Sequence, residues 1–362
     1  YRFGVSYNPT ESNAMIEGKM GNPDLTWERA RKTNLGLDFN MFKGRLSIQS
    51  DVFYEYRDNI LANRSTVPDI VGADLPAYNL GVMENYGFEF DGTWRHSVRE
   101  FSYWLRGNLS FARNRIVSMD EVDKKFAYQA ATGRRNGQFF GLIFDGYYNS
   151  WEEINALDRP VSAWSSNQLQ PGDCRYVDVN KDGRIDEYDY VPIGYSNIPE
   201  IVYGISFGFS WKGFDFSMLF QGASNVSIQY NGRALWPFIN GTESAKAYIL
   251  DRWTPERYAA GEDIHFPRLS INPSGHNYKP STLWTRDADY LRLKNMEIGY
   301  SLSKKTVRKM RIGGLRLFFN GSNLLTFTDV IDLDPEVLSG GNLELNAYPL
   351  QKVYNFGMNI TF

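Results

Sequence analysis

The clearest pattern in the chain is an alternation of apolar residues with small or polar ones at a period of two. In the last segment, 353–362, aromatic and aliphatic residues occupy every second position, and Asn, Gly or Thr fill the positions between them. Because successive side chains of a strand point to opposite faces, this period predicts strands with one apolar and one polar face. The same alternation marks segments 34–41, 46–56, 86–94, 101–111, 201–211, 214–220, 296–302 and 315–319.

These segments predict an all-β chain of roughly ten antiparallel strands, each close to the ~9–11 residues that cross a bilayer in a tilted barrel wall. The connections between the segments alternate in length. Short turns are expected near residues 43, 97 and 212, and long polar stretches occupy 62–80, 118–137, 149–198, 222–282 and 328–349. Short turns at one end and long loops at the other are typical of a transmembrane β-barrel with long extracellular loops.

Composition separates a membrane barrel from a soluble β-sandwich, whose strands also alternate. Aromatic residues make up 15% of the 362 residues, with 24 Phe, 23 Tyr and 9 Trp. The polar face of a sandwich meets solvent and usually carries Lys and Glu, whereas here it carries mostly Gly, Ser, Asn and Thr. Aromatic girdles at the lipid interface account for the excess of rings. We therefore expect strands that lie in a lipid bilayer.

Charge and the remaining chemistry argue against several other classes of protein. The formal net charge of -3 argues against a nucleic-acid partner, which usually requires a basic surplus. Cys174 is the one cysteine and cannot form an intrachain disulfide. The histidines at 96, 265 and 276 lack zinc-site spacing, and no nucleophile or phosphate-loop motif appears, so we expect no catalytic residues and no enzyme. The chain starts at Tyr1, which indicates that the numbering begins inside a longer precursor.

The C-terminal segment resembles the assembly signal of bacterial outer-membrane barrels. Its alternate apolar residues share one face and end in an aromatic residue: Tyr354, Phe356, Met358, Ile360 and Phe362. The resemblance implies recognition by the barrel-assembly machinery during insertion. The alternative is an ordinary edge strand that ends in Phe.

A twelve-residue stretch, 178–189, follows the spacing of a calcium loop of the EF-hand type. Its candidate ligands, at positions 1, 3, 5, 7, 9 and 12, are Asp178, Asn180, Asp182, the backbone carbonyl of Arg184, Asp186 and Asp189. Calcium takes about six to eight hard oxygen ligands, and clustered carboxylates repel one another unless a cation lies between them. The alternative is a turn without metal, since Asp, Asn and Gly favour turns. We expect a structural calcium ion that braces a surface loop.

Two further features lie in the long loops. Trp151, Trp164, Trp236 and Trp284 are placed in or beside them, and Trp236 and Trp284 are our candidate substrate-binding residues because aromatic faces stack on sugar rings. The alternative is that these rings pack against a neighbouring loop or a lid protein. Segment 242–260 predicts a short helix, capped by Thr242 and ending before Pro255.

Several segments, in order, resemble the C-terminal half of SusC-type TonB-dependent transporters (SusC/RagA family) of Bacteroidetes. These segments are 21–39, 79–94, 171–194 (PGDCRYVDVNKDGRIDEYDYVPIG), 247–256, 286–302, 319–328 (FNGSNLLTFT), 334–336 and 355–362 (NFGMNITF). Each match is weak alone, but together they cover most of the chain. The resemblance implies that residues 1–362 form the C-terminal part of a 22-stranded barrel with a plugged lumen.

The resemblance also implies a function and partners. The family imports oligosaccharides, and in some members peptides, across the outer membrane, with a SusD-like surface lipoprotein and energy from TonB–ExbB–ExbD. The plug, the TonB-binding segment and the N-terminal extension of the family do not occur in this sequence. Since an open sheet in lipid leaves unpaired edges, we expect the rest of the barrel to lie in further residues of the same protein. The alternative is that another chain completes the barrel. For the function, the alternative is a scaffold that does not transport, within a larger outer-membrane assembly.

Overall fold

A computed structural model describes residues 2–3, 15–16, 21–67, 75–164, 169–232, 236–238, 244–270, 275–331, 333–336 and 350–362. The chain divides into two compact units, which we describe separately. The first comprises Tyr1–Leu35, Val52–Gly87 and Arg113–Asn136. The second comprises Gly36–Asp51, Phe88–Ala112 and Gly137–Phe362. Within the described ranges, no helix has the length and apolar character that crossing a membrane requires.

The main element is a nine-stranded sheet with the order β19-β18-β17-β14-β13-β6-β5-β4-β3. Its strands are β3 (Arg29–Met41), β4 (Leu46–Ala62), β5 (Tyr78–Val98), β6 (Phe101–Ser118), β13 (Ile201–Trp211), β14 (Phe214–Ser224), β17 (Tyr290–Ser301), β18 (Gly314–Thr328) and β19 (Val353–Thr361). Pairing from β6 to β19 is antiparallel. The prediction of an all-β, antiparallel chain is therefore confirmed.

The smaller elements lie in the N-terminal segment and in the connections. The short strands are β1 (Arg2–Phe3), β2 (Met15–Ile16), β7 (Phe139–Gly141), β8 (Phe144–Tyr147), β9 (Val161–Ser162), β10 (Cys174–Tyr176), β11 (Arg184–Ile185), β12 (Val191–Ile193), β15 (Ser227–Gln229) and β16 (Thr285–Asp287). The helices are α1 (Trp151–Ile154), α2 (Pro255–Ala259) and α3 (Lys304–Lys309), and the 3-10 helices are η2 (Ala127–Gln129), η3 (Glu187–Asp189) and η5 (Ala247–Asp251).

In the second unit, the predicted two-faced strands pair with their apolar faces aligned. Phe207 faces Met218 on β14 and Leu105 on β6, so the apolar residues of the three strands form one face. The rings of Phe101 and Phe209 lie 5.9 Å apart, and those of Phe214 and Tyr300 lie 4.6 Å apart. This face is open to the surroundings: Trp211 is 48% and Phe214 49% exposed. A wide exposed aromatic face suits lipid and is unfavourable in water.

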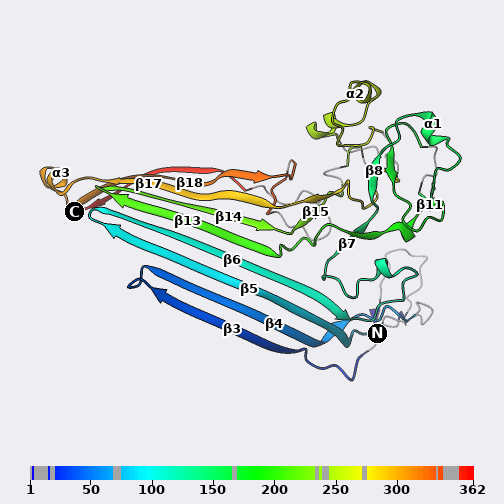
Figure 1. Cartoon of the computed structure of the whole chain (residues 1–362), viewed down its shortest axis with the longest axis horizontal. Helices are drawn as coiled ribbons and strands as arrows, with labels where there is room; N and C mark the ends of the chain where they lie inside the picture. Colours follow the sequence, from blue (N-terminus) through cyan, green and yellow to red (C-terminus); the bar gives the residue numbers. More distant parts are fainter. Residues whose placement is uncertain are drawn as a thin grey trace. The chain divides into compact units, whose positions relative to one another are not determined.

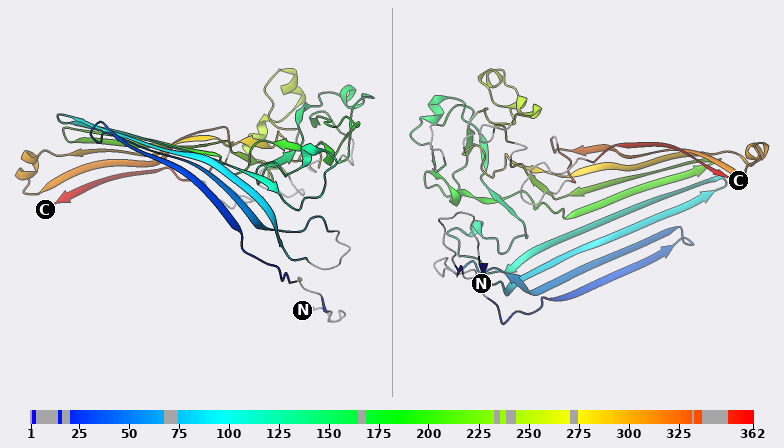
Figure 2. Two further views of the ribbon diagram at one scale, coloured as in Figure 1. Left: turned by 60° about the horizontal axis from the view of Figure 1, so that its bottom comes forward. Right: turned by 180° about the vertical axis from the view of Figure 1, so that it is seen from behind.

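The ends of these strands differ as the connection lengths predicted. Lys212 and Gly213 join β13 to β14 in a two-residue turn with φ values of 48° and 91°, a conformation that Gly adopts without strain. Figures 1 and 2 show β7, β8, β11, β15, α1 and α2 gathered at one end of β13 and β14, and α3 with the C-terminus at the other. In this unit, therefore, the long connections form a loop region at one end of the sheet.

The expected helix over 242–260 is placed incorrectly. Thr242 lies outside the described residues, and η5 ends at Asp251. The α-helix begins at Pro255 rather than ending before it, and the side chain of Thr254 caps it by accepting from the backbone N–H of Arg257. Proline lacks an N–H and has a preset φ, which suits the first turn of a helix as well as it opposes the interior.

Candidate functional site

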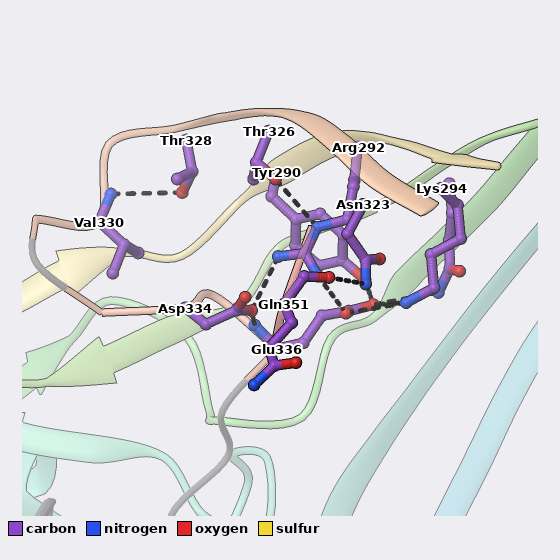
Figure 3. Close-up of polar contacts among 11 residues, drawn as sticks. Tyr290, Arg292, Lys294, Asn323, Thr326, Thr328, Val330, Asp334, Glu336 and Gln351 are labelled. Carbon is purple, nitrogen blue, oxygen red and sulfur yellow. Dashed lines mark hydrogen bonds and ion pairs between the residues drawn. The ribbon is translucent and has the colours of Figure 1, made fainter. Parts of the chain in front are cut away.

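A buried arginine organises the polar face of β17 next to the loop region. Arg292 has 1% of its side chain exposed. Its Nη1 donates to Oε2 of Glu336 at 2.6 Å, its Nη2 to Oδ1 of Asp334 at 2.8 Å, and its Nε to Oγ1 of Thr326 at 3.0 Å (Figure 3). The planar guanidinium thus ties segment 333–336 to two neighbouring strands of the sheet.

Glu336 collects further donors from the same face. It accepts from the hydroxyl of Tyr290 at 2.8 Å, from Nζ of Lys294 at 3.1 Å and from Nε2 of Gln221 at 3.3 Å. Two carboxylates therefore balance two cations, which is the condition under which charges are tolerated away from water. We call Arg292, Lys294, Asp334 and Glu336 the ion cluster. In the sequence analysis, 334–336 was one of the segments that resemble the SusC family. We assigned it no structural role, because the sequence does not show which strand it contacts.

The candidate substrate-binding tryptophans lie in the aromatic core of the loop region. Trp284 is 2% exposed, and its indole N–H donates to the carbonyl of Asn277 at 2.6 Å. Its ring lies 5.3 Å from that of Tyr278, and Trp236, which is partly buried, lies 5.0 Å from the same tyrosine. A buried ring cannot present its face to a solute, so this geometry favours packing for Trp284. Of the four loop tryptophans, Trp151 is the most open, at 51% exposed.

The motif 171–176 holds this core together through buried polar groups. Asp173 is 1% exposed and accepts from Nε of Arg268 at 2.6 Å and from Nδ2 of Asn277 at 2.9 Å. Oδ1 of Asn277 in turn accepts from the backbone N–H of Cys174 at 2.9 Å. A buried network with its partners satisfied rigidifies a loop. Burial raises the pKa of the Cys174 thiol, which therefore stays protonated and unreactive.

His276 belongs to the same core and has a structural geometry. Its Nε2 lies 2.7 Å from the carbonyl oxygen of Cys174, and its Nδ1 lies 2.8 Å from the hydroxyl of Ser162. A carbonyl can only accept, so Nε2 carries the proton, and Nδ1 accepts from the serine hydroxyl. Burial lowers the pKa of His276, which keeps the ring neutral.

The candidate calcium loop closes on itself through hydrogen bonds. Oδ2 of Asp178 accepts from the N–H of Gly183 at 2.8 Å, and Oδ1 of Asp182 accepts from the N–H of Arg184 at 3.0 Å. The fully buried carboxylate of Asp189 accepts from the N–H groups of Val179 at 2.8 Å and Asp186 at 3.0 Å. Gly183 has the φ of 80° that the sharp turn requires.

These bonds decide how a cation could be held. A carboxylate has about four lone-pair positions, so accepting one or two N–H bonds leaves room for a cation. Among the residues that the structure describes, no three His, Cys, Asp or Glu side chains lie close enough to hold a metal ion by themselves. A calcium ion would therefore also need Asn180 and the carbonyl of Arg184, and its binding stays a prediction. Asp186 caps η3 by accepting from the N–H of Tyr188 at 2.9 Å.

The C-terminal strand has the two faces that the alternation predicted. Pairing with β18 places Phe356 opposite Phe319, Met358 opposite Leu317 and Ile360 opposite Leu315. The alternate apolar residues are exposed, with Phe356 at 84% and the final Phe362 at 96%. Tyr354 lies on the same face, 58% exposed. A role for these residues as an assembly signal stays a prediction.

Comparison with known proteins gives consistent relatives. The chain is 29% identical to TonB-dependent receptor P26 of Formosa agariphila, over 99% of this chain and 37% of that protein. It is 26% identical to TonB-dependent receptor SusC of Bacteroides thetaiotaomicron, over 100% of this chain and 34% of that protein. The chain thus spans little more than a third of the length of these relatives.

A solved structure has the same fold. The chain aligns over its whole length with 38% of a chain in the structure of the RagAB peptide transporter, with a TM-score of 0.74 and 24% sequence identity. Residues 2–324 match the sequence profile of the family described as TonB dependent receptor-like, beta-barrel. Together with the two-faced strands, this match establishes that the chain belongs to the TonB-dependent receptor β-barrel family.

Proposed function

We propose that this chain forms part of the membrane wall and surface loops of an outer-membrane transporter that imports nutrients with energy from TonB. The observation that supports this most directly is the contrast between the two faces of the sheet. One face exposes aromatic residues such as Trp211 and Phe214, and the other carries hydrogen-bonded ion pairs such as the ion cluster. A wall between lipid and a wet lumen needs this contrast.

We further propose that the solute is an oligosaccharide or a peptide and that a SusD-like lipoprotein covers the outer opening. The RagAB structure, described as a peptide transporter, supports the peptide class, and the resemblance to SusC-type transporters supports the oligosaccharide class. TonB–ExbB–ExbD would act through a segment outside this sequence. The ion cluster would contribute by holding Asp334 and Glu336 against β17 next to the loop region.

Two finer proposals concern the loops. A calcium ion in loop 178–189 would brace the surface segment between β10 and β12, since extracellular sites bind usefully even at millimolar affinity. Trp236 would contact solute from the edge of the aromatic core. If substitution of Trp236 by Ala leaves the affinity for the solute unchanged, that assignment fails.

The test uses the full-length protein in its own bacterium. Deletion of the gene should abolish growth on, and uptake of, one class of oligosaccharide or peptide, and a plasmid copy should restore both. Collapse of the proton gradient should stop the uptake. Purification in mild detergent should retain a SusD-like lipoprotein. If the protein reaches the outer membrane but uptake of every class is normal and no lipoprotein is retained, the transport proposal is wrong and a scaffold role is favoured.

A further inference from the structure

A row of arginines crosses the apolar side of the sheet in the first unit. Arg29 and Arg31 on β3 both contact Asp58 on β4, with N–O distances of 2.9 and 3.1 Å. Arg115 on β6 contacts Glu84 on β5 at 2.5 Å. We call Arg29, Arg31 and Arg115 the arginine row. Ion pairs thus connect the guanidinium groups to carboxylates on β4 and β5, the two strands between β3 and β6.

The cations of the row are more exposed than the carboxylates they contact. The arginine side chains are 62%, 65% and 53% exposed, whereas those of Asp58 and Glu84 are each 12% exposed. The carboxylates lie beneath and position the guanidinium groups, whose remaining surface is open. Three cations and two anions leave a surplus of one positive charge in the row.

Two tyrosines join the row to the apolar part of the same face. The hydroxyl of Tyr54 donates to Oε2 of Glu84 at 3.1 Å, and the guanidinium of Arg31 lies 5.6 Å from the ring centroid of Tyr56. Along β4, the alternate residue before Tyr54 is Val52, which is 58% exposed. On β3, Leu35 comes four residues after Arg31 and is 67% exposed. Along this face, aliphatic residues are therefore followed by tyrosines and then by arginines.

This order matches the environments met on leaving a bilayer. Exposed aliphatic residues suit the hydrocarbon, tyrosines suit the interface, and cations suit the headgroups just beyond. The row lies where β4 and β6 run into the connections after Ala62 and Ser118, which are long. In a barrel of this layout the long connections face outward from the cell, so the row lies at the outer leaflet.

The other face of the same strands gives a matched comparison. There Lys32 pairs with Glu55 at 3.2 Å, and Arg57 pairs with Glu55 at 2.7 Å and with Glu28 at 3.0 Å. Two cations meet two anions, so this group has no surplus. The positive surplus lies on the side that continues into exposed apolar residues, which argues for a ligand in the membrane rather than a solute in the lumen.

We propose that the arginine row binds the phosphate groups of lipids in the outer leaflet. Arginine offers planar, two-pronged donors that fit phosphate oxygens, and a row spanning four strands spaces them along a membrane surface. The proposal rests on the outer-membrane placement above. It adds a lipid-recognition site that is separate from the transport path.

The test measures phosphorylated lipid retained by the full-length protein purified from its own membrane in mild detergent. The first variant carries Arg29→Gln, Arg31→Gln and Arg115→Gln. The second adds Asp58→Asn and Glu84→Gln, so that no buried carboxylate loses its partner. The control carries Lys32→Gln, Arg57→Gln, Glu28→Gln and Glu55→Gln on the other face. We expect retained lipid phosphate to fall at least about tenfold in both row variants and to stay unchanged in the control.

A second measurement identifies the source of the phosphate. Lipid A in mixed micelles should raise the melting temperature of the wild type but not of the row variants, and dephosphorylated lipid A should have a much smaller effect. Equal retention by all variants, an equal effect of dephosphorylated lipid, or full competition by inorganic phosphate would overturn the proposal. If a folded, outer-membrane protein gives one of these results, only the lipid proposal fails. Absence from the outer membrane would instead refute the proposed function.

Discussion

The ion cluster yields a prediction whose size follows from burial. Replacing Arg292 by Met removes a cation that is 1% exposed and three hydrogen bonds, two of them to carboxylates. Breaking a buried ion pair from one side costs about 3–5 kcal/mol, because the remaining charge stays away from water. Here Asp334 and Glu336 keep 11% and 20% exposure, and Lys294 still pairs with Glu336 at 3.1 Å. We therefore expect Arg292→Met to lower the free energy of unfolding by about 3 kcal/mol, the lower end of this range.

A matched arginine on the same sheet provides the control. Arg316 contacts Asp215 and Glu297, but its side chain is 25% exposed and theirs are 34% and 35%. Exposed pairs contribute about 0.2–1 kcal/mol, so Arg316→Met should cost no more than about 1 kcal/mol. The contrast between 1% and 25% exposure thus predicts a difference of about 2 kcal/mol between two chemically identical substitutions.

The assay is urea unfolding of the full-length protein in mild detergent, with the folded fraction read from gel mobility before and after heating. A double variant, Arg292→Met with Glu336→Gln, measures the coupling. Because the two residues are in contact, the double variant should lose less free energy of unfolding than the sum of the two single variants, by at least about 1 kcal/mol. Equal losses for Arg292→Met and Arg316→Met, or strictly additive losses in the double variant, would refute the argument from burial.

Three further predictions concern the loops and the sheet. A Cβ at Gly222 would lie 2.3 Å from the ring of Tyr203, so Gly222→Ala should lower the free energy of unfolding by about 1–3 kcal/mol, whereas Gly107→Ala, which meets nothing within 4 Å, should not. His276 has a lowered pKa in the folded loop, so its neutral form stabilises the loop fully above the ordinary pKa of about 6.5, and this stability is lost as the pH falls through that value toward the folded pKa. Limited proteolysis should therefore cut the loops faster at acid pH, and a His276→Gln variant should show no such pH dependence. Calorimetry should detect calcium binding with a dissociation constant of about 0.1–1 mM, weakened at least tenfold by Asp178→Asn, and an absence of heat would leave the loop as a turn without metal.

The strands were predictable because their signal is local. Alternation at a period of two is imposed on each strand by its own pleat, and the faces found for β13, β14 and β19 follow the residues that the sequence assigned to them. Strand ends were less predictable. β5 extends over Tyr78–Val98, beyond the apolar run at 86–94, because Tyr78, Leu80 and Val82 continue the alternation before the interruption at Glu84.

The candidate sites were harder to predict because they depend on which residues the loops contact in the folded chain. Arg292 and Glu336 are 44 residues apart, and no local pattern states that they meet. Trp284 was a binding candidate because it is an aromatic residue in a long loop. Its burial depends on the residues that pack around it, which the sequence does not show. Turn chemistry was easier: the loop with Gly183 closes as its spacing indicated, because the backbone there needs a positive φ. Calcium binding by that loop stays a prediction, because its candidate ligands are spread over the whole turn.

The ion cluster also has a consequence for the order in which the sheet closes. β19 must find β18 across connection 329–352, whereas β13 and β14 are joined by two residues. With Glu336 held on β17, the number of residues that separate the held segment from β19 falls to those at 337–352. Loop-closure entropy grows only with the logarithm of length, so this shortening changes the free energy of pairing by a few tenths of a kcal/mol. The cluster should therefore speed the pairing of β19 with β18 only slightly. Its larger effect should be to slow the separation of these two strands.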